Sequence, residues 1–407
     1  MAKTPKIRFK GFTEPWEEKK LLDCIEKITD FRGRTPKKLG MDWSENGYLA
    51  LSALNVKDGY IDFTQDVHYG DKKLYEKWMK GNELHKGQVL FTTEAPMGNV
   101  AQVPDDKRYI LSQRTIAFDV KPKVITENFL ATVLKSPSLM SNLIALSSGG
   151  TAKGVSQKSL ATVDFTIPED FEEQERISDA YSSINTLITL HQRKHDKLVN
   201  IKKAMLAKMF PKEGETVPEI RFKGFTEPWE RRKLGEIFDE YSEKGHPELP
   251  ALTIIQGGGT IHREDSDRNL QYDKSSLANY KVVDKGDFIV HLRSFEGGLE
   301  KATTRGIISP AYHTFHGEEI DPRFYYLYFR SPGFIDQDLK PHVYGIRDGR
   351  SIDIEGMKTI EIPWTSFAEQ KVIGDITDNL DTLITLHQRK TDKLKQIKQA
   401  MLESMFV

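Results

Sequence analysis

The nine residues TLITLHQRK, Thr186 to Lys194, decide the fold because they occur twice. The same nine letters return at Thr382 to Lys390, about half the length of the 407-residue chain further on. Both copies lie in stretches without Gly or Pro, Thr186–Leu206 and Thr382–Leu402, which favours a long helix in each place. Any fold for this chain must therefore explain why one helix is needed twice.

Three further pairs of segments repeat in the same order. They are Pro5–Leu21 with Pro218–Leu234, Lys86–Phe91 with Lys285–Val290, and Gly150–Pro168 with Gly345–Pro363. The first pair reads PKIRFKGFTEPWEEKKL and PEIRFKGFTEPWERRKL, which is too long a match for a common turn motif. Two units are too few for a solenoid, which needs at least about three repeats. The chain is therefore interpreted as a tandem duplication in which each unit is a domain followed by a helix.

Each domain is expected to mix strands and helices. Tyr48–Val56, Gln88–Thr93 and Thr115–Val120 are rich in β-formers and bounded by turn residues. Glu127–Ser136 indicates a short helix that stops at Pro137, and Pro322–Ser331 is its counterpart. The predicted fold class is α+β. The expected boundaries are domain 1 over 1–168, helix 1 over 169–212, domain 2 over 213–363 and helix 2 over 364–407.

The repeated helices carry apolar residues at alternating steps of three and four, the spacing of a coiled-coil seam. A lone surface helix with a wide apolar stripe is the alternative, but two matched copies favour pairing with each other. Because helix 1 leads from domain 1 to domain 2, an antiparallel partner would lead back, so Val407 should lie near Met1. The expected seam residues are Ile184, Leu187, His191, Leu198, Ile201, Leu380, Leu383, His387, Leu394 and Ile397.

His191 and His387 interrupt both seams at the same step. A metal site is one interpretation, but no further ligand is suitably spaced, so we expect no metal. A polar layer that fixes the register of the two helices is favoured instead.

Composition excludes several classes of protein. No apolar run reaches the roughly 18 residues of a membrane helix, and the N-terminal residues lack a signal-peptide core. Cys24 is the single cysteine, so no internal disulfide is possible, which fits a cytoplasmic location. Its side chain is expected to be buried. Phosphate-loop, zinc-protease, serine-hydrolase and methyltransferase motifs are missing from the sequence, so no cofactor and no catalytic residue are predicted.

Net charge is −1, so a nucleic-acid surface would have to be a local patch. Basic side chains recur in glycine-rich loops at Phe31–Lys38, Gly149–Lys158, His291–Gly298 and Gly345–Arg350. Such loops allow Arg and Lys to reach phosphates and base edges, and they stand at corresponding places in both units. Two domains held apart by helices suit duplex DNA, which offers half-sites about one helical turn apart.

The sequence resembles the specificity subunit of type I restriction–modification systems over almost its whole length. The resemblance is carried by the paired openings Arg8–Leu21 and Arg221–Leu234, by KGQVLFTTEAPMGN and LSQR in the first unit, and by the repeated helices. It implies a non-catalytic subunit whose two target recognition domains each read half of a split DNA sequence. It also implies as partners double-stranded DNA, two methyltransferase subunits and restriction subunits that translocate DNA.

The DNA-contacting residues expected on these grounds lie in the loops of both units. They are Arg32, Arg34, Thr92, Thr93, Glu94, Gln113, Arg114, Lys153, Lys158, Arg293, Ser294, Glu296, Arg347 and Arg350. In the second unit, residues 290–302 differ from the matching 91–103, so the two half-sites should differ. A coiled-coil scaffold that binds proteins and a stand-alone nuclease with an unrecognised acidic site are the alternatives.

Overall fold

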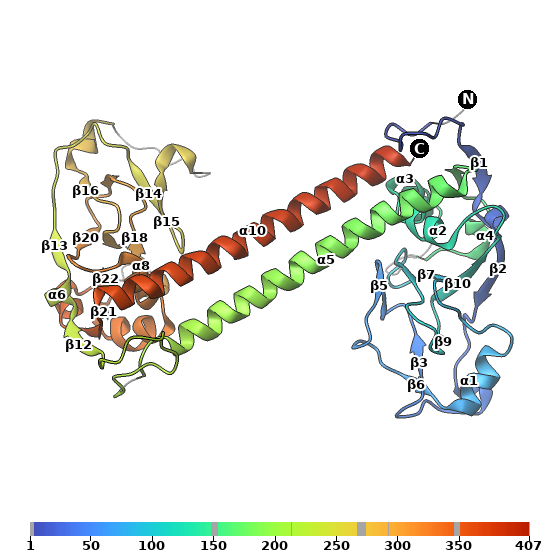
Figure 1. The fold of residues 1–407 in the computed structure, drawn as a ribbon, viewed down its shortest axis with the longest axis horizontal. Helices are drawn as coiled ribbons and strands as arrows, with labels where there is room; N and C mark the ends of the chain where they lie inside the picture. Colours follow the sequence, from blue (N-terminus) through green and yellow to red (C-terminus); the bar gives the residue numbers. More distant parts are fainter. Residues whose placement is uncertain are drawn as a thin grey trace. The chain divides into compact units, whose positions relative to one another are not determined.

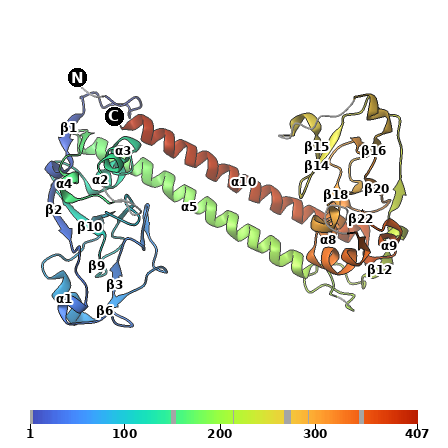
Figure 2. The ribbon, with the colours of Figure 1, turned by 180° about the vertical axis from the view of Figure 1, so that it is seen from behind.

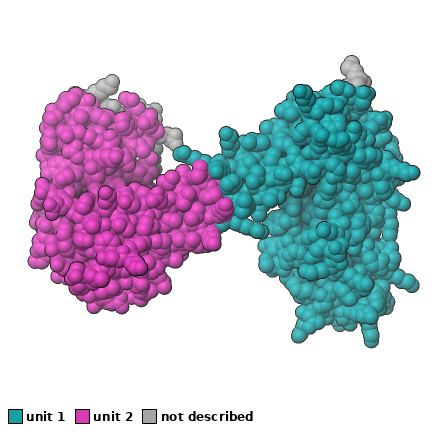
Figure 3. Space-filling view, viewed as in Figure 1, with its two compact units in different colours: residues 1–193, 388–407 teal, residues 194–387 magenta. Residues whose placement is uncertain are grey.

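The computed structural model forms two compact units (Figures 1 to 3). Unit 1 comprises residues 1–193 and 388–407, and unit 2 comprises residues 194–387. Each unit therefore contains one domain, the beginning of the long helix that follows it and the end of the other long helix. The described residues are 4–147, 154–212, 214–266, 274–291, 293–345 and 351–406.

Unit 1 is built on an antiparallel sheet of four strands in the order β2-β10-β7-β8. The strands are β2 (Ile25–Asp30), β10 (Thr115–Val120), β7 (Val89–Thr92) and β8 (Val100–Gln102). Both faces of this sheet are buried, which explains why β7 and β10 are apolar at successive positions rather than at every second one. The strands predicted over Gln88–Thr93 and Thr115–Val120 are confirmed.

Each face of the sheet has its own core. Phe91 and Phe118 point into a core shared with α2 (Glu127–Val133) and α3 (Pro137–Ala145). Leu90 and Ala117, one residue earlier in each strand, point into a second core. That second core holds α1 (Lys72–Met79) and the small sheet β6-β3-β9, formed by Tyr69–Gly70, Tyr48–Leu51 and Ile110–Leu111.

The helix expected over Glu127–Ser136 is present as α2, and it begins where the sequence indicates. The hydroxyl oxygen of Thr126 accepts a hydrogen bond from the backbone N–H of Phe129, the usual N-terminal cap. The strand expected over Tyr48–Val56 is shorter than predicted. It ends at Leu51, because the Asn55 side chain closes a turn by donating to the Ala50 carbonyl at 2.9 Å.

Unit 2 repeats the same sheet in the same order, β13-β20-β17-β18. Its strands are β13 (Asp239–Tyr241), β20 (His313–His316), β17 (Phe288–Val290) and β18 (Glu300–Lys301). The expected counterpart of α2 is α8 (Pro322–Phe329), capped by Asp321. An α+β fold with an internal repeat is therefore confirmed. In the glycine-rich segment of unit 2, β14 (Leu252–Ile255) pairs with β15 (Gly259–His262) as a hairpin.

Shorter elements complete the two units. They are β4 (Val56–Lys57), β5 (Tyr60–Ile61), α4 (Gln157–Leu160), α6 (Leu234–Ile237), β16 (Lys281–Val283), α7 (Ser294–Gly297), β19 (Gly306–Ile308), β21 (Val343–Tyr344), β22 (Ser351–Ile352) and α9 (Ile354–Lys358).

A two-stranded sheet joins each domain to the long helix that follows it. β1 (Glu17–Lys20) pairs with β11 (Asp164–Ile167), just ahead of α5 (Phe171–Lys208). In unit 2, β12 (Glu230–Lys233) pairs with β23 (Glu361–Trp364), just ahead of α10 (Phe367–Met405). The end of the repeated opening motif thus lies against the strand that leads into a long helix.

The arginine that both copies of the opening motif contain binds a buried glutamate in the first turns of the long helix. Nε and Nη2 of Arg8 donate to the two carboxylate oxygens of Glu173 at 2.6 and 2.8 Å. Arg221 makes the same contact with Glu369, at 2.8 and 2.9 Å. These hydrogen bonds raise the pKa of both guanidinium groups. We call each arrangement the clamp of its unit.

The residue before each clamp arginine binds the end of the other long helix. The backbone N–H of Ile7 donates to the Ser404 carbonyl near the end of α10, at 3.1 Å. In unit 2, the N–H of Ile220 donates to the Lys208 carbonyl at the end of α5, at 3.0 Å. Met1 and Val407 lie outside the described residues, but the hydrogen bond from Ile7 brings the two end segments of the chain together.

Within each unit the two helix segments run antiparallel. In unit 1, Ile177 of α5 shares a core with Leu402 of α10, and Tyr181 lies under Lys398, whose Nζ is 5.0 Å from the ring centroid. In unit 2, later residues of α5 meet earlier residues of α10 in the same sense. Met205 packs against the core that contains Ile373, and Lys202 binds Asp381 at 2.6 Å.

The structure corrects the predicted seam at four positions, which are exposed. They are Leu187 (42%), Ile201 (37%), Leu383 (42%) and Ile397 (41%). The more buried face instead steps by four and then three. It includes Ile184, Ile188, His191, His195 and Leu198 of α5, and Leu380, Ile384, His387, Thr391 and Leu394 of α10. Because residues 187 and 188 are both apolar, as are 383 and 384, the sequence fits either register.

We predict that Arg8→Met lowers the free energy of unfolding of unit 1 by about 3–5 kcal/mol. The substitution leaves the Glu173 carboxylate, which is fully buried, without its counter-charge. Denaturant unfolding measures the loss. Arg176→Met is the matched control, because the Arg176–Glu172 pair is exposed and such pairs contribute at most about 0.5 kcal/mol. Equal effects of the two substitutions would contradict a structural role for the clamp.

We also predict that a circular permutant folds and binds the same DNA as the parent. The chain is opened between Lys212 and Thr216 and closed by joining Val407 to Met1. A Gly-Ser pair makes the new junction as long as Met209–Glu219, which joins Lys208 to Ile220. Circular dichroism and DNA binding in the presence of a methyltransferase partner check this. A permutant that fails to fold would show that the junction at the chain ends is not equivalent to the internal one.

Candidate nucleic-acid interface

The expected DNA-contacting loops of unit 1 meet at one edge of the central sheet. At this edge β2 ends with Asp30, β7 ends with Thr92 and β10 begins with Thr115. Arg32 follows β2, Glu94 follows β7 and Arg114 precedes β10, so antiparallel pairing alone brings these loops together. The segment around Gly154 joins them, because Gly154 forms a backbone bridge with Glu94.

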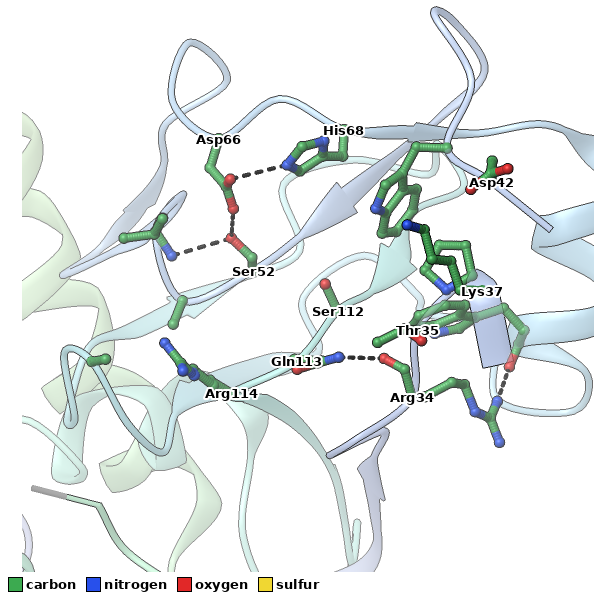
Figure 4. Close-up of a pocket in the computed structure, with 16 residues that line it drawn as sticks. Arg34, Thr35, Lys37, Asp42, Ser52, Asp66, His68, Ser112, Gln113 and Arg114 are labelled. Atoms are coloured by element: carbon green, nitrogen blue, oxygen red, sulfur yellow. Dashed lines mark hydrogen bonds and ion pairs between the residues drawn. The ribbon is translucent and has the colours of Figure 1, made fainter. Parts of the chain in front are cut away.

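A pocket of about 390 Å³ opens beside this edge (Figure 4). It is lined by polar and aromatic residues from both the central sheet and the neighbouring β3 region. Arg34, Gln113 and Arg114, which the sequence singled out, all line it. Trp43 and His68, which the sequence did not single out, line it as well and stack with an interplanar angle of 20°.

Arg34 lines the pocket but its guanidinium is used within the protein. Nη1 of Arg34 donates to the Trp78 carbonyl at 2.5 Å, and its Cζ lies 4.2 Å from the centre of the Phe31 ring. The carbonyl of Arg34 in turn accepts from Nε2 of Gln113 at 2.5 Å (Figure 4). Arg34 and Gln113 therefore hold the pocket wall, and their expected role as DNA contacts stays a prediction.

Arg114 presents its side chain differently. Its side chain is 54% exposed and its nearest acidic partner is Glu94, 42% exposed, with 3.8 Å between Nε and the carboxylate oxygen. That distance is beyond hydrogen-bond range, so the guanidinium donors are available to an incoming ligand. On the structure, Arg114 and Glu94 are the strongest candidates for base contacts in unit 1.

Asp66, one of the two acidic residues that line the pocket, is bound within the protein. The Asp66 carboxylate accepts from the Ser52 hydroxyl at 2.5 Å and lies 3.2 Å from Nε2 of His68 (Figure 4). The serine bonds to the aspartate and not to the histidine, so this trio lacks the order of a hydrolase triad. Its effect is to fix the orientation of the His68 ring beneath Trp43.

Three of the expected contact residues are buried and position the loops instead. Thr92 is fully buried, and its hydroxyl oxygen accepts from the backbone N–H of Asn99. Thr93 is 2% exposed and donates its backbone N–H to the Arg114 carbonyl at 2.8 Å. In unit 2, Ser294 is fully buried and accepts from the N–H of His291. Sequence patterns do not distinguish such loop-holding hydroxyl groups from exposed ones.

Unit 2 places an Arg–Glu pair at the same sheet edge. Arg293 follows β17 and donates from Nε to Glu296 at 2.9 Å, with 65% and 43% of the side chains exposed. His291, between β17 and Arg293, is largely buried, and this burial lowers the pKa of its imidazole. The neutral form of His291 is therefore favoured at pH 7, next to the exposed guanidinium.

The remaining expected contacts are divided between exposed and undescribed positions. Arg32 is exposed and binds Asp30 at 3.3 Å. Lys158 is exposed on α4, whose neighbouring residue Gln157 donates to the same Asp30. Lys153, Arg347 and Arg350 lie outside the described residues.

Comparison with known proteins explains why the same edge is built twice. The family profile described as type I restriction modification DNA specificity domain matches residues 13–200 and again residues 226–396. The chain belongs to this family. It is thus a non-catalytic specificity subunit of a type I restriction–modification system, the component that recognises the DNA target.

Relatives match along nearly the whole chain. The type I restriction enzyme MjaVIII specificity subunit of Methanocaldococcus jannaschii is 24% identical over 96% of this chain and 91% of its own length. The putative MjaX specificity subunit of the same organism is 22% identical over 96% and 92%. The crystal structure of the specificity subunit from M. genitalium has the same fold, with a TM-score of 0.55, 14% identity, and coverage of 100% of this chain and 99% of that one.

The described residues include no group of three or more His, Cys, Asp or Glu side chains placed to hold a metal ion. None of their helices is both long and apolar enough to cross a membrane. Cys24 is buried as expected, and burial raises the pKa of its thiol to about 11.

We predict that Arg293→Ala relaxes specificity at one base of one half-site only. An arginine bound to guanine discriminates by about 1–3 kcal/mol, and the substitution removes this contribution. Binding of the assembled complex to duplexes varied at single positions measures it. Arg305→Ala is the control, because Arg305 is similarly exposed and paired with Asp284, at the opposite end of β17.

A different result would assign Arg293 to the DNA backbone. Binding would then weaken evenly across all sequences, and the salt dependence would fall by about one charge. Unchanged binding with unchanged salt dependence would remove Arg293 from the interface.

Proposed function

We propose that the chain reads a bipartite DNA target, with one half-site contacted by each domain. The observation that carries this proposal is the repeated sheet edge, which presents an exposed arginine and glutamate in both units. Residues 1–168 and 213–363 act as the recognition domains in this proposal. Residues 169–212 and 364–407 act as the helices between and after them.

The two half-sites differ in this proposal because the arginines stand on different loops. In unit 1, Phe91 pairs with Ile116, and Arg114 lies two residues ahead of Ile116. In unit 2, Val290 is the counterpart of Phe91 and pairs with His313, so the position matching Arg114 holds Ala311. Unit 2 supplies its guanidinium from Arg293, which follows β17, whereas Arg114 of unit 1 precedes β10. The two arginines therefore approach a base pair from different strands of the sheet.

The paired helices set the spacing between the half-sites. Within each unit, the segments of α5 and α10 run antiparallel and each is bonded to the clamp at one end. Continuous pairing along both helices would form the antiparallel coiled coil predicted from the sequence. The length of that coiled coil would then fix how many base pairs separate the two contacted sequences.

Two methyltransferase subunits dock on the helices, one on each copy of TLITLHQRK. In unit 1, Leu187 and Leu190 are 42% and 45% exposed. In unit 2, the equivalent Leu383 and Leu386 are 42% and 43% exposed. Exposed leucines that recur with identical neighbours suit two copies of one partner. Restriction subunits join this assembly, and DNA is the substrate on which all of them act.

Lengthening both helices tests the proposal. Four residues inserted after Lys194 in α5 and four after Lys390 in α10 add about 6 Å to each helix. This length corresponds to about two base pairs of duplex, at about 3.4 Å each. Methylated positions are mapped by sequencing DNA from cells that carry the complex. We expect the same half-site bases with a longer spacer.

Two variants serve as controls. Seven residues in each helix add about two turns, so the contacting faces are nearly restored, and the spacer should grow by about three base pairs. Four residues in α5 alone should impair pairing and lower activity. An active complex in which matched insertions leave the spacer unchanged would reject the role of the helices in spacing. The absence of any split target in the parent complex would reject the bipartite proposal itself.

A further inference from the structure

Three residues that line the pocket of unit 1 have left-handed backbone conformations. They are Asp66 (φ 49°), Ala95 (φ 48°) and Arg114 (φ 63°). Among the described non-glycine residues, one other has positive φ, Glu319. For a residue with a Cβ atom this conformation costs about 1–2 kcal/mol. Strain of this kind gathers where a site needs a side chain in a particular place.

Hydrogen bonds on the backbone side hold Arg114 in this conformation. Its carbonyl accepts from the N–H of Thr93 at 2.8 Å and from the Thr93 hydroxyl at 3.3 Å. The Thr93 carbonyl in turn accepts from the N–H of Val155 at 3.0 Å. Because Thr93 and Val155 are both buried, the peptide after Arg114 cannot rotate to relieve the strain. The guanidinium is thereby directed to the pocket side of the sheet edge.

Arg34, Gln113 and Asp66, which also line the pocket, are already bound within the protein. The Arg34 guanidinium donates to the Trp78 carbonyl, Gln113 donates to Arg34, and the Asp66 carboxylate is bound to Ser52 and His68. In contrast, the described structure gives Arg114 one loose ion pair, to Glu94 at 3.8 Å. Figure 4 shows Arg34 and Arg114 on either side of Gln113, so the two guanidinium groups are separate. Lys37 also lines the pocket, but its ammonium lacks the planar fork that matches two adjacent acceptors, so Arg114 is the better placed of the two to bind an acceptor pair.

We propose that Arg114 reads a guanine in the half-site of domain 1, and that the strained backbone presents its guanidinium for this contact. The proposal rests on the bipartite function above. Guanine alone offers two adjacent acceptors, O6 and N7, to the planar fork of an arginine in the major groove. Adenine and cytosine each present an amino donor there, and thymine presents a single acceptor beside its methyl group. Glu94, at the distance found, limits the rotation of the guanidinium without occupying its donors.

The first part of the test compares Arg114→Ala with the parent in the complex with methyltransferase subunits. Methylation mapping gives the parent target, and competition binding uses duplexes in which each guanine of one half-site is replaced in turn. We expect one guanine that the parent prefers over other bases by about 10- to 100-fold. Arg114→Ala should reduce this preference to less than about threefold. Preferences in the half-site altered by Arg293→Ala should not change.

The second part of the test measures strain by comparing Arg114→Gly with Arg114→Ala. Both variants lack the guanidinium and should lose the same discrimination. Glycine adopts positive φ without an energetic penalty, whereas alanine still has that penalty. The glycine variant should therefore have the higher thermal midpoint. At an ordinary strand or helix position the order is reversed, because glycine there is less stable than alanine. Glu319→Gly and Glu319→Ala give the same comparison at a left-handed residue of unit 2, with no effect on binding.

The outcomes separate this proposal from the function on which it rests. A split target in which Arg114→Ala keeps every base preference would overturn the assignment of Arg114 and leave bipartite recognition standing. A glycine variant less stable than the alanine variant would overturn the role of strain. A parent complex without any split target would instead reject the bipartite function.

Discussion

The buried ion pair between the opening motif and the long helix is the contact on which the rest of the structure depends. Each unit has one bidentate arginine–carboxylate pair shielded from water, Arg8 with Glu173 in unit 1 and Arg221 with Glu369 in unit 2. Such a pair is costly to bury and costlier to break, because either partner alone would be an uncompensated charge. The residues next to each arginine bind the incoming end of the other helix. One short motif therefore determines where a domain begins, where its helix starts and where the other helix stops.

The two clamps are equivalent without being identical. Glu369 also accepts from the indole N–H of Trp229 at 3.0 Å and from the Thr365 hydroxyl. In unit 1 the matching indole nitrogen of Trp16 is buried and has no partner among the described residues. The clamp tolerates this difference because the arginine–carboxylate geometry is the same in both units. The loops at the sheet edge lie outside the clamps, so their sequences can diverge without disturbing the helices.

The repeat made much of this fold predictable. Long segments that match in order can only be explained by duplicated structure. Runs of β-forming residues predict β7 and β10, and a capping threonine ahead of an apolar helix predicts α2. The sequence did not predict which face of each long helix is the more buried one. Adjacent apolar residues, Leu187 with Ile188 and Leu383 with Ile384, fit two registers equally well, and only packing selects between them.

The sequence predicted which loops meet at the candidate site, but not how their side chains are placed. Glycine-rich basic loops indicated the sheet edge, and Arg114 and Arg293 are exposed there. The sequence could not show that Arg34 is bound to a backbone carbonyl, or that Thr92 and Thr93 are buried. Trp43 and His68 reach the pocket from a neighbouring region of the chain, through tertiary packing that no local pattern encodes. Whether a side chain is exposed, and which group it binds, depends on residues that are distant in the sequence. The sequence alone shows only the type of each residue.

The core of unit 1 has a consequence for the order of events during synthesis. Leu402, Met405 and Phe406 are buried in it, and the Phe406 ring lies 6.2 Å from that of Trp16. The ribosome makes these residues after the whole of unit 2, so the core of domain 1 is completed only after unit 2 has been made. At roughly 5–20 residues per second, the first domain waits tens of seconds with an open apolar surface. Unit 2, whose segments are contiguous in the chain, can close earlier. A chain that stops before the end of α10 would thus leave the core of domain 1 incomplete, although that domain was made first.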